Sequence, residues 1–279
     1  MTFAFRDLLA APPPIRVVDA GAAAFQADVY ARLSEQGLCE VVGFEPHRED
    51  WARRNAAARP GHRYLPYALG DGTVRRFYEC AGGLTNSFFR PNAALTAKFA
   101  RFDMAIVAEY DIQTHRIDDL AEIGDIDYLK LDVQGGELDI IEGARTALAT
   151  ALVVHTEVEF IPLYVDQPLI GDIDVALRKS GFWMHRLQNV GGGLMQPFTP
   201  ENPQAGGAGH IVWADAIYVR SFLSFDSLPP DKLIKLAIIM HEVYQSWGLA
   251  TMALEAHDAQ TGGGLRQAYL DKLKEAGIF

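Results

Sequence analysis

The residues around Asp132 have the types and spacing of a site for acid–base chemistry. An apolar run at residues 128–131 brings Asp132 to its carboxyl end, two glycines follow, and Glu137 begins a segment with apolar residues at helical spacing. In an open α/β sheet, ligands bind beyond the carboxyl ends of the strands, where a carboxylate can serve as a general base. On spacing alone, a solvated acid at a strand end, followed by a glutamate favoured by the helix dipole, explains the pattern equally well.

Two further residues are candidates for proton transfer. Glu157 lies in the next apolar run, at residues 152–159, and we expect Asp132 and Glu157 to flank an acceptor hydroxyl. His210 follows a stretch rich in glycine and proline at residues 190–209, which is too long for a simple turn and is either a lid or disordered. If that stretch is a lid, His210 could reach the pocket as a base when it closes.

A histidine and a glutamate near these acids have simpler interpretations. His155 could join Asp132 and Glu157 as a metal ligand, but a buried, hydrogen-bonded strand histidine is the simpler reading, and no metal is predicted. Glu137 is expected to orient the preceding glycines by accepting hydrogen bonds from backbone N–H groups.

The beginning of the sequence has the pattern of a nucleoside site. Asp19-Ala20-Gly21 follows an expected first strand, and Glu45 closes the second. A glycine permits close approach of the backbone to a ligand, and an acid at this place accepts both ribose hydroxyls. The complete G-x-G-x-x-G pattern of pyrophosphate sites is missing, so a nucleoside without phosphates fits better. An ordinary turn followed by a surface glutamate is the alternative.

A Rossmann-like, mostly parallel sheet with helices on both faces would position these residues. Strands are expected at 15–18, 40–44, 63–67, 123–132 and 152–159, with an antiparallel C-terminal pair at 182–188 and 214–220. Helices are expected at 22–36, 47–58, from 137 to 148, and at 173–180, and residues 73–80 are expected to form a hairpin arm. The predicted organisation is an N-terminal lead-in (1–14), one α/β domain (15–222) and a C-terminal helical extension (223–279) with helices at 233–257 and 265–276.

Composition excludes several classes of protein. The chain has 279 residues, with 25 Lys and Arg against 36 Asp and Glu, hence a net charge of −11, which argues against nucleic acid as a partner. No apolar run is long enough to span a bilayer, and the N-terminus lacks the apolar core of a signal peptide, so a cytoplasmic protein is expected. Cys39 and Cys80 have neither metal-site nor disulfide spacing.

Four segments together resemble one family. They are VVDAGA (17–22), GFEP (43–46), YALGDG (67–72) and IDYLKLDVQGGELDIIEG (126–143). The chain is similar, from about residue 17 to 220, to the FkbM-type class I methyltransferases, which use S-adenosylmethionine. The resemblance implies methylation of a hydroxyl group on a sugar, a glycan or another small polar molecule.

The resemblance also implies a role for each matching residue. Asp19, Ala20 and Gly21, at the end of the first strand, would lie against the methionine part of the cofactor. Glu45, at the end of the second strand, would hold the ribose hydroxyls, with Pro46 shaping the adenine slot. Ala68, Leu69 and Asp71 would face the adenine, and Asp132 would lie near the sulfonium.

Three questions stay open at this stage. Thr85, Asn86 and Ser87 could hydrogen-bond a polyol acceptor or could cap a helix that starts near Asn92. A nicotinamide-dependent oxidoreductase and a non-catalytic binding protein built on the same fold are the alternative functions. An apolar stripe in the extension could cover the domain itself or form the contact of a homodimer, and we favour the homodimer. The stripe consists of Leu236, Ile239, Met240, Val243, Tyr244 and Trp247.

Overall fold

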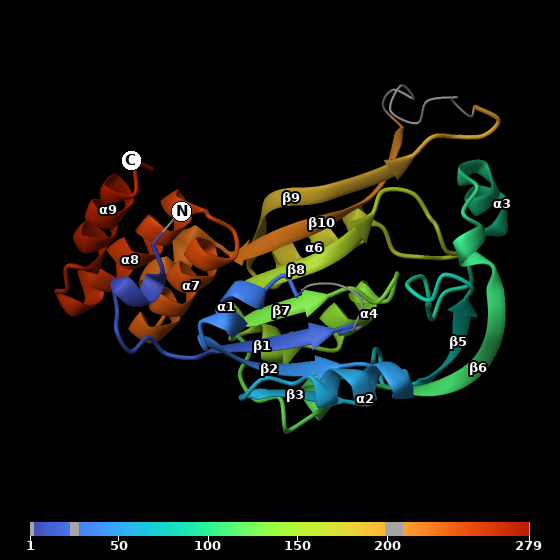
Figure 1. Ribbon diagram of the computed structural model, residues 1–279, viewed down its shortest axis with the longest axis horizontal. Coiled ribbons are helices and arrows are strands. Elements are labelled where there is room, and N and C mark those ends of the chain that lie inside the picture. Colours follow the sequence, from blue (N-terminus) through green and yellow to red (C-terminus); the bar gives the residue numbers. More distant parts are fainter. Residues whose placement is uncertain (1–2, 23–27, 199–208, 279) are drawn as a thin grey trace.

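The fold is built on a seven-stranded sheet with the strand order β3-β2-β1-β7-β8-β10-β9 (Figure 1). The computed structural model describes residues 3–22, 28–198 and 209–278. Strands β3, β2, β1, β7 and β8 are mutually parallel, whereas β10 is antiparallel to both β8 and β9, which confirms the expected Rossmann-like class. The strands are β1 Ile15–Ala20, β2 Cys39–Phe44, β3 His62–Leu65, β7 Tyr128–Leu131, β8 Val153–Glu159, β9 Phe182–Gly193 and β10 His210–Arg220.

Each face of this sheet is covered by a different set of helices. Alternate side chains of a strand point to opposite faces. Val18, Leu129 and Val154 belong to the core on the face covered by α4 (Glu137–Glu142), α5 (Arg145–Leu148) and α6 (Ile170–Lys179). Val17 and Tyr128 belong to the core on the opposite face, which is covered by α1 (Ala31–Glu35), α7 (Pro230–Glu242) and α8 (Trp247–Thr261).

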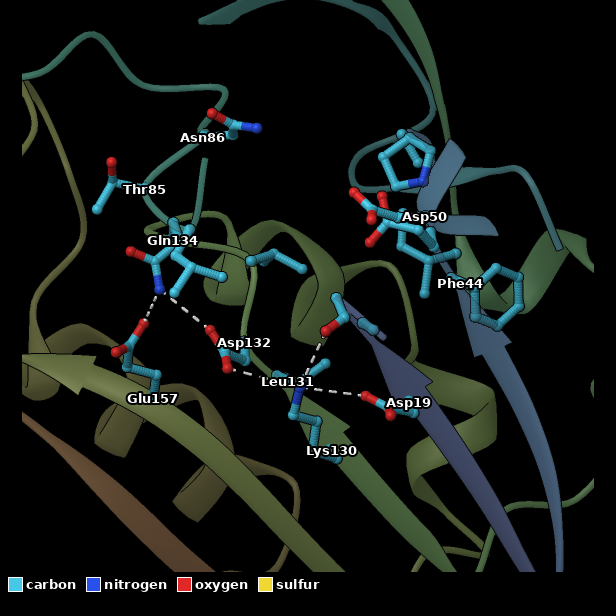
Figure 2. A pocket seen from close by; sticks show the side chains of 18 of the residues that line it. Asp19, Phe44, Asp50, Thr85, Asn86, Lys130, Leu131, Asp132, Gln134 and Glu157 are labelled. Atoms are coloured by element: carbon cyan, nitrogen blue, oxygen red, sulfur yellow. Dashed lines mark hydrogen bonds and ion pairs between the residues drawn. The ribbon is translucent and has the colours of Figure 1, made fainter. Parts of the chain in front are cut away.

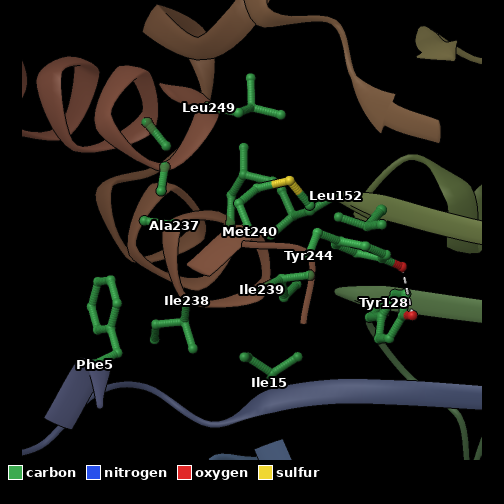
Figure 3. Close-up of a cluster of buried hydrophobic side chains, with 14 of the residues drawn as sticks. Phe5, Ile15, Tyr128, Leu152, Ala237, Ile238, Ile239, Met240, Tyr244 and Leu249 are labelled. Carbon is green, nitrogen blue, oxygen red and sulfur yellow. Dashed lines mark hydrogen bonds between the residues drawn. The ribbon is translucent and has the colours of Figure 1, made fainter. Parts of the chain in front are cut away.

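The C-terminal extension is therefore a layer of the fold that packs on the sheet (Figure 3). The single helix expected at 233–257 is two helices, α7 and α8, which pack against each other and are followed by α9 (Leu265–Glu275). The chain turns between them at Gln245, whose φ is +51°. Leu236, Ile239, Met240 and Tyr244 are all buried in the chain's own core. The stripe thus covers the domain itself, and its buried members offer no surface to a second copy.

A smaller three-stranded sheet, in the order β4-β6-β5, lies beside the main sheet. Strand β5 (Val74–Cys80) coincides with the expected hairpin arm, but it pairs with β6 (Ile106–His115) across a long connection. We did not predict β6 from the sequence, although apolar and polar residues alternate over residues 108–113, as is typical of a strand with one exposed face. The strand has no long apolar run, and most of its side chains are exposed. The short strand β4 (Ala68–Leu69) pairs in parallel with β6, and the remaining helices are α2 (Arg48–Ala56) and α3 (Ala93–Thr96).

Several predicted boundaries were wrong. The strand expected at 123–132 begins only at Tyr128, and the strand expected at 214–220 begins already at His210. The first helix is described only at residues 31–35, while residues 28–30 are not helical and residues 23–27 lie outside the described part. The helix from Glu137 ends at Gly143 and restarts at Arg145. Strand β9 continues to Gly193, inside the expected loop, because a Cβ on Gly191 would lie 2.2 Å from the Trp213 ring, so this glycine permits close strand pairing. Residues 199–208 of that loop lie outside the described residues.

Candidate active site

A cavity of about 490 Å³ lies beyond the carboxyl ends of β1, β2, β7 and β8 (Figure 2). This is the place where ligands bind in open α/β sheets. It collects most of the predicted site residues: Asp19, Ala20, Gly21, Glu45, Pro46, Ala68, Leu69, Asp132 and Glu157. Asp71 and His210 are not among the residues that line it.

The turn after β1 touches the turn after β7. Gly21 has a φ of +81°, and a Cβ built on it would lie 1.9 Å from the carbonyl oxygen of Asp132. The Asp132 backbone N–H donates to the carbonyl of Ala20 at 3.1 Å. Glycine is therefore required here for both its backbone conformation and its missing side chain.

Three polar side chains lie opposite one another on the adjacent strands β1, β7 and β8. Asp19 on β1 pairs with Lys130 on β7, and Lys130 pairs with His155 on β8. The Lys130 ammonium lies 3.2 Å from Asp19 Oδ1 and 3.6 Å from Asp132 Oδ2, and it donates to the Gly21 carbonyl at 3.1 Å. Burial alone would lower the pKa of Lys130, but the Asp19 and Asp132 carboxylates raise it above its ordinary value. Lys130 therefore stays a cation between two carboxylates.

Glu45 occupies the other end of the cavity, at the end of β2. Its side chain is buried, and Oε1 accepts a hydrogen bond from the His47 N–H at 2.8 Å. Burial raises the pKa of Glu45 despite that hydrogen bond. Ala68 and Leu69 line the cavity nearby together with Phe44, as a flat apolar ligand would require.

Asp71 is instead engaged in its own turn. It accepts hydrogen bonds from the Thr73 N–H at 2.9 Å and the Thr73 hydroxyl at 2.7 Å, and it pairs with Arg75 at 3.4 Å. These bonds close the turn before β5. Asp71 therefore does not line the cavity beside Ala68 and Leu69.

Gln134 joins the two predicted catalytic carboxyl groups (Figure 2). Its Nε2 donates to Asp132 Oδ1 at 3.0 Å and also to Glu157 Oε2. The residue has a φ of +58°, and Tyr164 and Ser87 hold it by donating to its side-chain and backbone oxygens at 3.2 Å and 2.6 Å. The structure thus brings the carboxylates of Asp132 and Glu157 to the same amide nitrogen.

Burial and neighbouring charges raise the pKa of Glu157. Its pKa is raised well above the ordinary value, first by burial and then by the carboxylates of Asp132 and Glu159. A general base works best when its pKa lies near the working pH. The environment therefore makes Glu157 a stronger base than an exposed glutamate.

Glu137 supports the turn from below. Its two carboxylate oxygens accept hydrogen bonds from the N–H groups of Val133 at 2.8 Å and Gly135 at 2.9 Å. The side chain thus orients the turn as expected, although the first donor is Val133 and not Gly136. Burial raises the pKa of Glu137 to about 7, although these N–H groups act to lower it.

The family follows from a comparison of sequences. The profile described as "Methyltransferase FkbM domain" matches residues 19–184, which include Asp19, Glu45, Asp132 and Glu157. The chain belongs to the FkbM methyltransferase family. A comparison with curated proteins gave no match.

Solved structures similar to this FkbM methyltransferase domain are distant in sequence. Magnesium protoporphyrin IX methyltransferase from Synechocystis PCC 6803, with bound SAM, is 13% identical, with 75% of this chain and 71% of that chain covered and a TM-score of 0.39. Precorrin-6y C5,15-methyltransferase from Geobacter metallireducens GS-15 is 11% identical, with 77% and 84% covered and a TM-score of 0.38. The plantazolicin methyltransferase, in complex with SAH, is 8% identical, with 77% and 79% covered and a TM-score of 0.37.

Several lining residues of this FkbM domain were not predicted as site residues. Lys130 and Asp215 each interrupt an apolar strand with a charge, and that interruption is the signal that could have revealed them. The others come from separate segments whose meeting no local pattern shows: Tyr30, Asp50, Arg54, Arg101, Asn189 and Trp213.

The polar loop before α3 is partly in the site. Thr85 and Asn86 line the cavity, whereas Ser87 lies behind it and donates to the Gln134 carbonyl. None of these residues caps α3, because Asn92 accepts the hydrogen bond from the Leu95 N–H at its N-terminus. The loop therefore contributes two polar side chains to the cavity wall.

The predicted histidines have different environments. His155 is buried and hydrogen-bonded to Tyr244, which agrees with its simpler interpretation. His210 is exposed at the start of β10, where it pairs with Gly193. Among the described residues, no three His, Cys, Asp or Glu side chains are grouped so that they could hold a metal ion. No helix in the described ranges is long and apolar enough to cross a bilayer.

Proposed function

We propose that this chain is an S-adenosylmethionine-dependent methyltransferase that methylates a hydroxyl group of a sugar, a glycan or another small polar molecule. The observation that carries the proposal is the arrangement of one cavity around Lys130. The buried acid Glu45 and the apolar Ala68 and Leu69 lie at one end, and the Asp132 and Glu157 pair lies at the other. The first end suits a nucleoside, and the second suits activation of a hydroxyl group.

The residues at the first end fit this cofactor. Glu45 would accept the ribose hydroxyls with its second oxygen, since Oε1 is already occupied by the His47 N–H. Gly21 leaves room for the methionine part beside the Asp132 turn. The three carboxylates of Asp19, Asp28 and Asp132 carry one more charge than the two cations that pair with them, Lys130 and Arg54, can neutralise. The excess negative charge favours a cationic sulfonium over a neutral thioether.

The residues at the second end fit transfer to oxygen. When bound, S-adenosylmethionine supplies an electrophilic methyl group whose bonding electron pair leaves with sulfur. Glu157 would remove the hydroxyl proton of the acceptor as its oxygen forms the new bond to carbon. Asp132 and Gln134 would hold that hydroxyl in line, because positioning is the main requirement of such a displacement.

A calorimetric titration tests the cofactor. We expect S-adenosylmethionine and S-adenosylhomocysteine to bind and NAD to give no heat. Binding of NAD alone would instead indicate an oxidoreductase, and absence of binding by all three compounds would indicate a non-catalytic protein.

A further inference from the structure

A buried hydrogen-bonded cluster connects the C-terminal extension to the cavity. Tyr128 on β7 and Tyr244 at the α7–α8 junction join their hydroxyl groups at 2.7 Å (Figure 3). His155 Nδ1 lies 3.1 Å from the Tyr244 hydroxyl and 3.3 Å from that of Tyr128. All three side chains are buried, so these groups have to satisfy one another.

The number of protons in the cluster determines which ring nitrogen of His155 is the donor. The two tyrosine hydroxyls bring two protons, and burial raises the pKa of both Tyr128 and Tyr244, so both stay protonated. Among the described residues, each hydroxyl has two possible acceptors, the oxygen of the other tyrosine and His155 Nδ1. One hydroxyl therefore donates to the other, and the second donates to Nδ1. Nδ1 therefore accepts, and Nε2 carries the hydrogen of the ring.

His155 Nε2 points at Asp215, 3.5 Å from its Oδ2. Asn189 on β9 donates to the same oxygen at 2.7 Å. Asp215 lines the cavity and lies opposite Glu157 in the pairing of β10 with β8. Asn189 thus holds this oxygen of Asp215 by a hydrogen bond, and His155 Nε2 lies 3.5 Å from the same oxygen. The carboxylate is paired in register with Glu157, the residue that would remove the acceptor proton.

We propose that Asp215 is an acceptor-binding carboxylate, and that the extension positions it through Tyr244 and His155. The acceptor part of this inference rests on the proposed function; the positioning part does not. Burial alone would raise the pKa of Asp215, but His155 and Asn189 lower it below its ordinary value. A fixed anion here accepts hydrogen bonds from neutral hydroxyl or amino groups and repels phosphorylated or carboxylated acceptors.

The α7–α8 junction, which carries Tyr244, is hydrogen-bonded to β9. Arg186 on β9 donates to the Tyr244 carbonyl at 3.0 Å, and Ser246 lies 3.0 Å from His185 Nε2. Both Asp215 and Tyr244 lie beyond residues 19–184, which the family profile covers. The extension would therefore complete an acceptor site that the matched segment alone does not contain.

Nitrogen-15 NMR of the histidine rings tests the positioning, with His155→Gln used to assign the signal. We expect the Nε2–H tautomer in the full-length protein at neutral pH and a mixture of tautomers in the double variant Y128F/Y244F. Tyr269→Phe is the matched control, because it removes a buried tyrosine–histidine contact in the extension, at 3.1 Å from His241, without a link to the cavity. An Nδ1–H tautomer in the unaltered protein would overturn the proposal even if the double variant failed to fold.

Asp215→Asn tests acceptor binding. Radiolabelled methyl transfer would be measured over a panel of neutral sugars, amino sugars and sugar phosphates. We expect transfer to neutral or amino sugars, at least a tenfold rise in KM in Asp215→Asn, and S-adenosylmethionine affinity within twofold of the unaltered protein. Preference for sugar phosphates, or an unchanged KM, would contradict the acceptor role. Failure of the proposed function would look different, because the unaltered protein would then not bind S-adenosylmethionine at all.

Discussion

Asp215 on β10 lies directly opposite Glu157 on β8, so two carboxyl groups stand side by side at the wall of the cavity. Opposite residues on one face of an antiparallel pair are close enough for their charges to interact. His155 and Asn189 lower the pKa of Asp215 against the effect of burial. The pKa of Glu157 is raised by burial, by Asp132 and, to a smaller extent, by Asp215. One carboxyl group is thereby kept as an anion while its neighbour holds its proton more tightly.

Removing the charge of Asp215 should change the titration of Glu157. In Asp215→Asn we expect the pKa of Glu157 to fall, because one of the charges that raise it is gone. Carboxyl carbon-13 NMR follows this titration without an acceptor. Glu255→Gln is a suitable control, since Glu255 is an exposed side chain on α8 outside the cavity. An unchanged titration of Glu157 would show that the two groups do not interact.

Glu157→Gln should abolish proton removal while keeping the shape of the site. We expect methyl transfer to fall by roughly 10²–10⁴-fold, the usual contribution of a general base, with unchanged affinity for S-adenosylmethionine. In the unaltered enzyme the rate should rise with pH as Glu157 loses its proton, at a pH above the ordinary range for glutamate because its pKa is raised. Full turnover by Glu157→Gln would show that another residue is the general base, and Asp132 would then be the first candidate.

Gly21→Ala should prevent cofactor binding. The new Cβ would meet the Asp132 carbonyl, and alanine at a φ of +81° adds backbone strain of about 1–3 kcal/mol. Calorimetry and thermal unfolding would measure both effects. Gly248→Ala is the matched control, because a Cβ on Gly248, within α8, meets nothing within 4 Å; it should be neutral or stabilising. Normal binding by Gly21→Ala would show that the turn does not form part of the cofactor site.

Glu137 should contribute less to stability as the pH rises from about 5 to about 7. Burial raises the folded-state pKa of Glu137 to about 7, so the folded protein binds a proton more tightly than the unfolded chain does. Its contribution is complete below the unfolded pKa of about 4.3 and is lost as the pH rises towards 7, at up to about 1.4 kcal/mol per pH unit. Urea unfolding at pH 5 and pH 8 would measure the loss, which should be smaller in Glu137→Gln. An equal change in the unaltered protein and in Glu137→Gln would contradict the assignment.

Asp127 should anchor the extension to the sheet. Its buried carboxylate lies 2.6 Å from Lys232 and 2.9 Å from Lys235, both on α7. Asp127→Ala would leave two largely buried ammonium groups without a carboxylate, although Lys232 would still donate to the carbonyl groups of Ile126 and Thr150. We expect a loss of about 3–5 kcal/mol with faster hydrogen exchange in α7. Asp125→Asn should cost less than about 1 kcal/mol, because the Asp125–Arg16 pair is exposed. Equal effects of the two variants would show that α7 is held by apolar contacts alone.

Most of the sheet could be predicted from apolar runs, because buried parallel strands are apolar almost throughout. Asp19, Glu45 and Asp132 could be placed at its edge because each ends such a run. The strand β6 was missed because it is not an apolar run; the polar–apolar alternation over residues 108–113 is the signal that could have revealed it. The extension of β9 through Gly191 was also hidden, because there glycine permits packing against Trp213 and does not mark a loop.

The part of the site that the sequence did not predict depends on contacts between distant segments. Asp215, Asn189 and Tyr244 come together with His155 only when β8, β9, β10 and the α7–α8 junction are assembled. A pattern within one segment carries no information about such a cluster. The same reason explains Asp71, which lies in a matching segment although it is not among the residues that line the cavity. His210 was expected to reach the pocket only on closure of the preceding stretch, and this stays a prediction.

A crystal structure with S-adenosylhomocysteine is the sharpest test of the proposed site. We expect adenine beside Ala68 and Leu69, ribose hydroxyls on Glu45, and sulfur next to Asp132 with an open path towards Glu157. Electron density for the ligand outside this cavity, or a sulfur atom turned away from Asp132, would contradict this arrangement.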